Sequence, residues 1–442
     1  MDATTVIEIR SLIDHRGMSS RQWILTVLCS IIVMADGMDV AIMGFVAPPI
    51  IGAWHVSPAA FGMVMGAAPI GLAIGAILAG SSSDWFGRRR VLMGSVLSFG
   101  ILTLLTTLTT STTEMALMRL LTGLGLGAAM PNATTLLSEY VPQKHKSALL
   151  AAMFTGFNLG SAAIGFVAAA LIPLFGWQSV FYFGAAIPLA LFPVLYFLLP
   201  ESARFLLVRN ATQQKISAVL SRITGADLSD VQCITLQEEA TTTRQPVAVL
   251  FTKAFAPRTF TLWVTYFMGL VVIYLSTSWL PTMMKGAGMS IDRAANVTAM
   301  FQLFGTAGAV LVGLVMDRFG ANLTIAAFYF LGGVMLVVLG LGGIQSAELA
   351  VVVGAVGFFM SGAQTGLNAY APGCYPTVAR ATGVSCMLGV GRLGSILGSS
   401  IGGLLLSLGW GFDGIFPLLA IPAALAGVAI LVNRVAMHGH VN

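Results

Sequence analysis

Twelve long apolar stretches constrain this chain more than any other feature of its sequence. A helix needs about 20 mostly apolar residues to cross the hydrocarbon core of a bilayer, and every stretch is long enough. They lie near 23–46, 58–80, 91–110, 115–138, 148–172, 178–198, 259–283, 293–316, 322–343, 347–371, 382–406 and 412–433. Only 9% of the residues are charged, whereas a soluble domain has about 25%. The sequence therefore predicts an all-α membrane protein with twelve transmembrane helices and excludes a water-soluble domain.

A repeated motif divides the twelve stretches into two sets of six. Gly80, Asp84, Phe86 and Gly87 follow the second stretch, and the same residue types follow the eighth stretch within 313–320. Internal repeats of this kind are typical of transporters built from two related halves. We expect two pseudo-symmetric six-helix bundles at 23–198 and 259–433, a cytoplasmic linker at 199–258, and cytoplasmic terminal segments at 1–22 and 434–442.

The positive charges between the stretches set the expected orientation. Lys and Arg are retained on the cytoplasmic side of a membrane protein, and placing the N-terminus there puts nearly all of them inside. The inside set includes Arg10, Arg16, Arg21, Arg88, Arg89, Arg90, Lys144, Lys146, Arg318, Arg380 and Arg434, while Lys285 and Arg293 fall outside. We therefore expect both termini in the cytoplasm. The same distribution accounts for the net charge of +5 without a nucleic-acid partner.

Two aspartates, Asp36 and Asp39, interrupt the first apolar stretch. At i, i+3 spacing they share one face of a helix, and each charge at the centre of a bilayer costs at least about 2.5 kcal/mol. The pair therefore predicts a cavity or a charged partner instead of lipid contact. Burial and mutual repulsion both favour the protonated form of a carboxylate, so we expect the pair to carry protons. The alternative is a structural pair that bonds to another helix.

Two arginines lie within apolar stretches, Arg119 in the fourth and Arg392 in the eleventh. A guanidinium presents a planar fork that binds a carboxylate through two hydrogen bonds. Arg392 lies deeper, so we expect it to bind an anionic substrate, to pair with Asp36 or Asp39, or to alternate between them. Arg119 is expected to contact the substrate from the same cavity or, alternatively, to snorkel to the outer surface.

Polar and aromatic side chains recur in the stretches that are expected to line a central path. Aromatic rings stack on planar ligands and amides orient them, although helix packing in a membrane uses the same residue types. Besides the two arginines, the substrate-binding candidates are Asn158, Tyr266, Tyr274, Gln302, Gln364 and Asn368.

The loop after the second stretch is the predicted site of a cytoplasmic gate. A carboxylate at a helix end interacts favourably with the N-terminus of a neighbouring helix, and the arginines that follow can bridge carboxylates. The expected gating residues are Gly80, Asp84, Gly87, Arg88, Arg89, Glu139, Glu201, Asp317, Arg318 and Arg380. The alternative is that the arginines only fix the topology.

Motifs for ATP binding and for catalysis are missing from the sequence. It contains no GxxxxGK[ST] run, no HExxH and no credible nucleophile elbow. The four cysteines, Cys29, Cys233, Cys374 and Cys386, have neither zinc nor disulfide spacing. We therefore expect no enzymatic activity, no cofactor and no metal, with a proton gradient as the energy source.

Several motifs together resemble one branch of the major facilitator superfamily, the aromatic acid:proton symporters. They are Asp36-Gly37-Met38-Asp39, the run from Arg119 to Asn132, Ser138-Glu139-Tyr140, Pro200-Glu201-Ser202, Arg380-Ala381-Thr382-Gly383 and Gly391-Arg392-Leu393-Gly394. The resemblance spans nearly the whole chain. It implies that both aspartates are required for coupled uptake and that Arg119, Glu139, Asp317 and Arg392 are functional. Trp85 departs from the pattern, because a basic residue is usual there.

This resemblance implies a transporter that works as a monomer in a bacterial inner membrane. It would import a hydroxybenzoate-like or benzoate-like carboxylate together with protons by alternating access, with lipid as its surroundings. Protonation of Asp36 or Asp39 is expected to remove repulsion against the incoming carboxylate, which Arg392 helps to hold. The alternatives are a transporter of the same superfamily for a sugar or a dicarboxylate, an efflux pump, and a sensor that binds its ligand without moving it.

Overall fold

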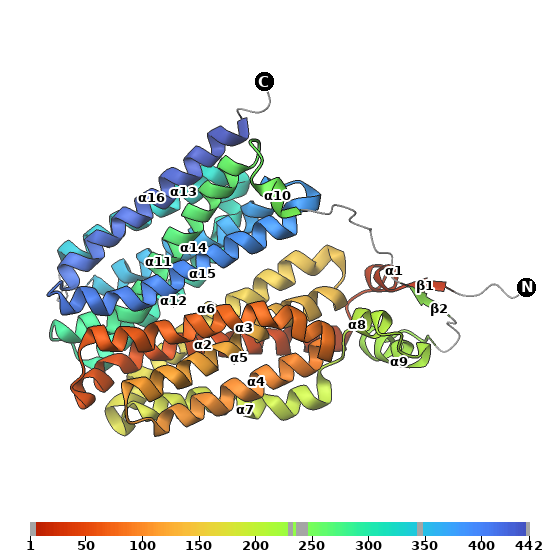
Figure 1. Ribbon diagram of the computed structural model, residues 1–442, viewed down its shortest axis with the longest axis horizontal. Coiled ribbons are helices and arrows are strands. Elements are labelled where there is room, and N and C mark those ends of the chain that lie inside the picture. Colours follow the sequence, from red (N-terminus) through yellow and green to blue (C-terminus); the bar gives the residue numbers. More distant parts are fainter. Residues whose placement is uncertain (1–5, 229–232, 236–245, 343–347, 439–442) are drawn as a thin grey trace, which may run out of the picture.

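The computed structural model describes residues 6–228, 233–235, 246–342 and 348–438, and it is almost entirely helical (Figure 1). The other residues belong to the predicted N-terminal segment, linker, ninth-to-tenth loop and C-terminal tail, and they lie outside the described residues. In the described part, 12 helices are long and apolar enough to cross a membrane. The prediction of a twelve-helix membrane protein is confirmed.

Each half contributes six long helices. In the first half they are α2 (Ser20–Trp54), α3 (Pro58–Phe86), α4 (Arg88–Leu105), α5 (Thr112–Tyr140), α6 (Gln143–Phe175) and α7 (Gln178–Leu198). In the second half they are α11 (Ala256–Gly286), α12 (Ile291–Phe319), α13 (Ala321–Gly342), α14 (Leu349–Tyr370), α15 (Thr377–Ser407) and α16 (Phe412–His438). The 3-10 helices η1 (Thr106–Leu108) and η2 (Ala371–Cys374) follow α4 and α14.

The two halves pack their helices in equivalent pairs. In the first half α3 packs on α5, α2 on α6 and α4 on α7, and in the second half α12 packs on α14, α11 on α15 and α13 on α16. Between the halves, α2 contacts α11, α6 contacts α12 and α3 contacts α15, so these contacts obey the same two-fold relation. The predicted pseudo-symmetric architecture is therefore confirmed.

The repeated motif forms the same turn in both halves. Gly87 between α3 and α4 has a φ of 90°, and Gly320 between α12 and α13 has a φ of 86°. Each donates its backbone N–H to the helix that it ends, Gly87 to Ser83 and Gly320 to Met316. Only glycine adopts such a positive φ without strain, which explains why both copies of the motif end in this residue.

Contacts between the halves gather at the end of the molecule that is remote from the linker, here called the distal end. There the backbone N–H of Ala59 on α3 donates to the Ser407 hydroxyl on α15 at 3.0 Å. Nearby, Gly62 lies against the backbone carbonyl of Ser400, and the α2 residue Gly44 lies against the carbonyl of Thr277 on α11. The two halves diverge from this end toward the linker end (Figure 1).

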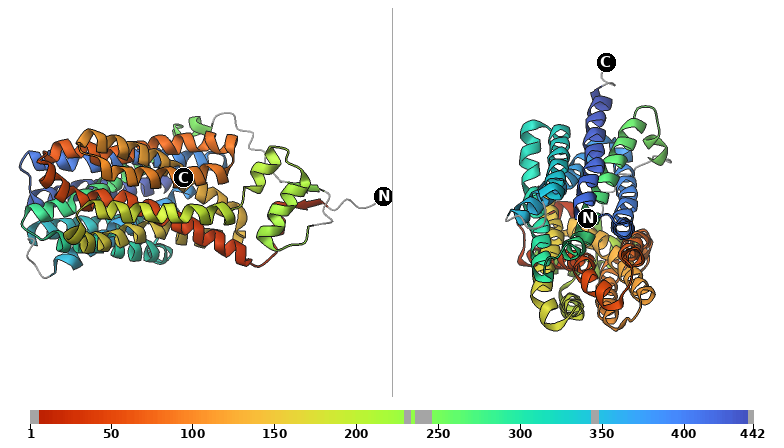
Figure 2. Two further views of the ribbon diagram at one scale, coloured as in Figure 1. Left: turned by 90° about the horizontal axis from the view of Figure 1, so that it is seen from below. Right: turned by 90° about the vertical axis from the view of Figure 1, so that its left-hand side faces the viewer.

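The linker and the N-terminal segment form a small folded unit at one end of the long helices (Figure 2). Its elements are β1 (Val6–Glu8), α1 (Ile9–Asp14), α8 (Ala203–Val208), α9 (Gln213–Thr224) and β2 (Cys233–Thr235). The last helix of the linker, α10 (Pro246–Leu250), lies apart from this unit and packs on α15. Strands β1 and β2 pair in parallel. The unit is tied to the first half at the start of α6, where the Arg10 side chain of α1 donates to Gln143 Oε1 at 2.5 Å and the Gln143 N–H donates to Asp14 Oδ1 at 2.7 Å.

Candidate functional site

Asp39 points into the first half, where it forms a buried ion pair with Arg119. One guanidinium nitrogen, Nη1, lies 3.2 Å from Oδ1 and 3.2 Å from Oδ2 of the carboxylate. The Thr103 hydroxyl donates to Oδ1 at 2.6 Å. Asp39 is 3% exposed and Arg119 is 0% exposed, so the alternative in which Arg119 snorkels to the surface is wrong.

Neighbouring helices hold Arg119 in this position. Its Nη2 donates to the hydroxyls of Thr106 and Thr122 at 2.8 and 3.2 Å, and its guanidinium carbon lies 5.2 Å from the centre of the Phe181 ring. These contacts give most of the guanidinium nitrogens a partner, and every partner belongs to the first half. Contact between Arg119 and a substrate stays a prediction.

Asp36 lies one turn earlier on α2 and faces the second half. It is 2% exposed, and its Oδ1 has no hydrogen-bond partner among the described residues. The charged or polar groups that act on it from the other half are Arg392 on α15 and Tyr274 on α11. The adjacent carbonyl of Gly37 accepts from the Ser161 hydroxyl of α6 at 2.7 Å, which fixes this part of α2. Asp36 is therefore the aspartate at the interface between the halves.

The wall of the second half opposite Asp36 carries most of the predicted binding side chains. Arg392 is partly exposed and interacts with the Tyr274 hydroxyl. About two turns along α11, the Tyr266 hydroxyl interacts with the side chains of Gln364 and Asn368 on α14. We name Asp36 together with these five side chains the interface site.

Two other predicted binding residues lie on helices that flank the interface site. Asn158 is partly buried on α6, and Gln302 is 6% exposed on α12. Within the described part of the chain, no hydrogen bond joins either side chain to the interface site. Their contact with a substrate stays a prediction.

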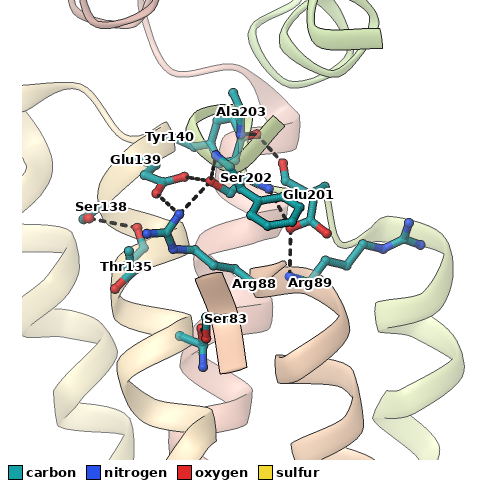
Figure 3. Close-up of polar contacts among 12 residues, drawn as sticks. Ser83, Arg88, Arg89, Thr135, Ser138, Glu139, Tyr140, Glu201, Ser202 and Ala203 are labelled. Carbon is teal, nitrogen blue, oxygen red and sulfur yellow. Dashed lines mark hydrogen bonds and ion pairs between the residues drawn. The ribbon is translucent and has the colours of Figure 1, made fainter. Parts of the chain in front are cut away.

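At the linker end, Arg88 joins three elements in the cluster shown in Figure 3. Its Nη1 lies 2.9 Å from Oε1 of Glu139 on α5 and donates to the Ser202 hydroxyl at 2.9 Å. The Ser202 hydroxyl in turn donates to Oε2 of Glu139 at 2.5 Å. Arg88 is therefore a bridge from α4 to α5 and to the start of α8.

Glu201 extends the same cluster to the backbone (Figure 3). Its Oε1 accepts from the backbone N–H groups of Arg89 and Ser202, each at 3.0 Å. The Tyr140 hydroxyl donates to the Glu201 carbonyl and accepts from the Ala203 N–H. Unlike the predicted gate, this cluster is confined to the first half and the linker. We name these residues, with Arg88 and Glu139, the linker-end cluster.

The other predicted gating residues are exposed in this conformation. Exposed side chains include Asp84, Asp317, Arg318 and Arg380, and Gly80 is also exposed. Among the described residues, the Asp84 carboxylate accepts no hydrogen bond, although the Asp84 carbonyl accepts one from Arg209 at 3.0 Å. The expected contact of Asp84 with a neighbouring helix N-terminus is therefore not made in this conformation.

Sequence reasoning missed Thr103, Ser202 and Tyr329, which contact predicted site residues. Ser202 belongs to the Pro200-Glu201-Ser202 motif, so the sequence contained an indication that this residue is functional. Thr103 and Tyr329 each lie in an apolar stretch. A hydroxyl there is as consistent with helix packing as with a functional contact.

Replacement of Arg88 by alanine should loosen α8 from the first half. The change leaves the partly buried Glu139 carboxylate without its cation, which should cost about 1–3 kcal/mol. Hydrogen exchange of the α8 amides should therefore accelerate, as measured by mass spectrometry on the purified protein. Arg90→Ala is the matched control, because Arg90 is exposed on the same helix. Equal exchange rates in both variants would show that Arg88 only contributes to topology.

Two related six-helix halves with charged groups buried at their interface define a membrane transporter that works without ATP-binding motifs. The chain belongs to the Major Facilitator Superfamily, whose model matches residues 29–355. It is therefore a multi-pass membrane transporter and not an enzyme, as predicted.

Two named transporters are similar to this chain over nearly its whole length. The gallate transporter of Pseudomonas putida is 50% identical over 427 residues, covering 97% of this chain and 95% of the relative. The 4-hydroxybenzoate transporter PcaK of Pseudomonas aeruginosa is 45% identical over 439 residues, covering 99% and 98%. These similarities confirm the predicted resemblance to the aromatic acid transporters of the superfamily.

Solved structures agree with the fold. The inward open conformation of the xylose transporter XylE from E. coli superimposes with a TM-score of 0.72, covering 93% of this chain and 95% of that one. At 16% sequence identity, this similarity shows the fold alone.

Proposed function

We propose that this protein imports aromatic carboxylates together with protons across a bacterial inner membrane. The observation that carries the proposal is the position of Asp36, a buried carboxylate with an unpartnered oxygen that faces Arg392 and Tyr274 across the interface between the halves. The names of the relatives, which transport gallate and 4-hydroxybenzoate, support an aromatic acid as the substrate.

The interface site suits an aromatic acid chemically. Arg392 offers two parallel donors to a carboxylate, and it is partly exposed, whereas Arg119 is occupied by Asp39. Tyr266 and Tyr274 supply aromatic surface beside it, on which a planar ring can stack. Gln364 and Asn368 supply hydrogen-bonding groups for the rest of the molecule.

The two aspartates differ in their partners, and this difference supports Asp36 as the proton carrier. Asp39 receives hydrogen bonds from Arg119 and Thr103, so both of its oxygens already have partners. Asp36 is equally buried and has fewer donors, so its ionised form is more costly. In the proposed cycle, a proton on Asp36 removes one negative charge beside Arg392 and lets the substrate carboxylate take its place there.

Alternating access would follow from the contacts between the halves. With both termini and the linker in the cytoplasm, as the positive charges predict, the closed distal end faces the periplasm, and this conformation opens inward. Asp84, Asp317, Arg318 and Arg380 would then come together when the linker end closes. The proton gradient supplies the energy, and one chain contains the whole path.

Uptake by cells that express the chain tests this function. Radiolabelled 4-hydroxybenzoate, gallate, benzoate and a phenylpropionate should accumulate above the external concentration for at least one of these acids. A protonophore should remove the accumulation, because the proton gradient drives it. Cells without the gene, and labelled succinate and xylose as non-aromatic solutes, serve as controls.

The possible outcomes separate the alternatives. Accumulation of succinate or xylose alone would replace the aromatic substrate by a dicarboxylate or a sugar. Lower accumulation in expressing cells than in cells without the gene would indicate efflux. Accumulation of an aromatic acid that resists the protonophore would overturn the coupling to protons while leaving the substrate class in place.

A further inference from the structure

A buried hydrogen bond lies directly behind the interface site. The hydroxyl of Tyr329 on α13 donates to Oε1 of Gln364 on α14 at 2.9 Å. Tyr329 is 0% exposed, and α13 packs on α14 and α16. Tyr329 is therefore closed off from a substrate in this conformation, and the hydrogen bond of its hydroxyl connects it to Gln364 in the interface site.

The hydrogen bond fixes which end of the Gln364 amide is free. Its oxygen is occupied by Tyr329, while its nitrogen Nε2 has no hydrogen-bond partner of ordinary geometry among the described residues. Gln364 is only 7% exposed, and a buried donor without a hydrogen bond is destabilising. The Tyr266 hydroxyl, which also interacts with Asn368, lies beside this amide. The donor is thus in the interface site beside the Tyr266 hydroxyl, and it makes no hydrogen bond of ordinary geometry among the described residues.

The helix that carries Tyr266 and Tyr274 leaves room for this arrangement. Gly269 lies between them on α11, and a Cβ at this position would overlap both the Gln364 Oε1 and the Tyr329 hydroxyl. Three helices of the second half therefore meet at one hydrogen bond. A larger residue at position 269 would displace the bond without adding or removing a polar group.

We propose that Tyr329 is a positioning residue that holds the Gln364 amide so that its donor binds a ring hydroxyl of the substrate. This inference rests on the proposed function. When Arg392 holds the carboxylate, a hydroxyl on the ring can accept from Gln364 Nε2 and donate to Asn368 or Tyr266. A site built to bind a substrate hydroxyl rejects the analogue that lacks it, because its own polar groups are then left unpaired. Tyr329 and Gln364 thus determine the preference for hydroxylated acids over benzoate.

The test is the ratio of inhibition by benzoate and by 4-hydroxybenzoate, measured against uptake of labelled 4-hydroxybenzoate. In Tyr329→Phe the amide is free to rotate, so the preference for the hydroxylated acid should fall by about tenfold. Gly269→Ala should produce the same change. The double variant Tyr329→Phe with Gln364→Leu removes both partners, so it should keep the fold and lose the preference completely.

Tyr370→Phe is the matched control. The Tyr370 hydroxyl also bonds to side-chain amides in the second half, donating to Asn433 at 2.8 Å and accepting from Asn322 at 2.9 Å, but it lies at the linker end. Its loss should leave the ratio unchanged. An unchanged ratio in Tyr329→Phe, or an equal loss of both acids, would overturn the inference, because a structural role alone predicts those results.

A second measurement covers variants that do not transport. Thermal shifts of the purified protein with each acid report binding, and the same loss of preference is expected there. If the unaltered protein binds and moves no aromatic acid, the proposed function fails. If it prefers 4-hydroxybenzoate and the variants keep that preference, only the role of Tyr329 fails.

Discussion

The substitution Asp36→Asn should abolish accumulation of the substrate and leave its exchange across the membrane intact. Asparagine has the shape of the protonated aspartate but cannot release a proton. The variant should therefore resemble the form with a proton on Asp36 permanently. Because the substrate then moves without a proton, its internal concentration should reach the external value and stop. The measurement is uptake into proteoliposomes with an imposed proton gradient, compared with counterflow between labelled and unlabelled substrate.

Two further variants make this expectation specific. Asp36→Glu keeps a titratable group and should retain part of the accumulation. Asp292→Asn removes a carboxylate that is exposed at the start of α12 and should change nothing. If Asp36→Asn still accumulates substrate and a protonophore still abolishes that accumulation, another group carries the proton.

The twelve spans and the two-fold plan could be predicted from the sequence because both depend on local properties. The cost of moving polar residues into hydrocarbon is read from composition, and the turn at Gly87 and Gly320 repeats because the same backbone conformation is needed twice. The parallel pairing of β1 with β2 could not be predicted. The two strands lie before and after the first half in the sequence. Neither strand carries a sequence pattern that indicates the other as its partner.

The site was predicted only in part, for a geometrical reason. Asp36 and Asp39 were found because intramembrane charge is costly, but the spacing of i, i+3 left open which of them meets which arginine. Two side chains at i, i+3 point in somewhat different directions from the helix axis. Asp39 therefore contacts Arg119 within the first half, while Asp36 faces Arg392. Tyr329 gave no signal, since a tyrosine in an apolar helix is most often a packing residue.

The buried pair of Asp39 and Arg119 should behave as a structural unit when either partner is removed. Asp39→Asn leaves a fully buried guanidinium without a counter-charge, and Arg119→Met leaves a buried carboxylate in the same position. Breaking a buried ion pair in this way costs about 3–5 kcal/mol. Each single variant should therefore give a low yield of folded protein and a lower melting temperature, measured by size-exclusion chromatography and thermal unfolding in detergent.

The double variant Asp39→Asn with Arg119→Met should recover much of the loss, because neither charge is left alone. A double variant that is less destabilised than the sum of the two single variants would show that the two charges interact within the first half. If the double variant is folded but does not transport, the pair also takes part in transport, as the resemblance to the symporters implies. If the two single effects simply add in the double variant, the ion pair contributes nothing to stability, and Asp39 returns as a second candidate for the proton.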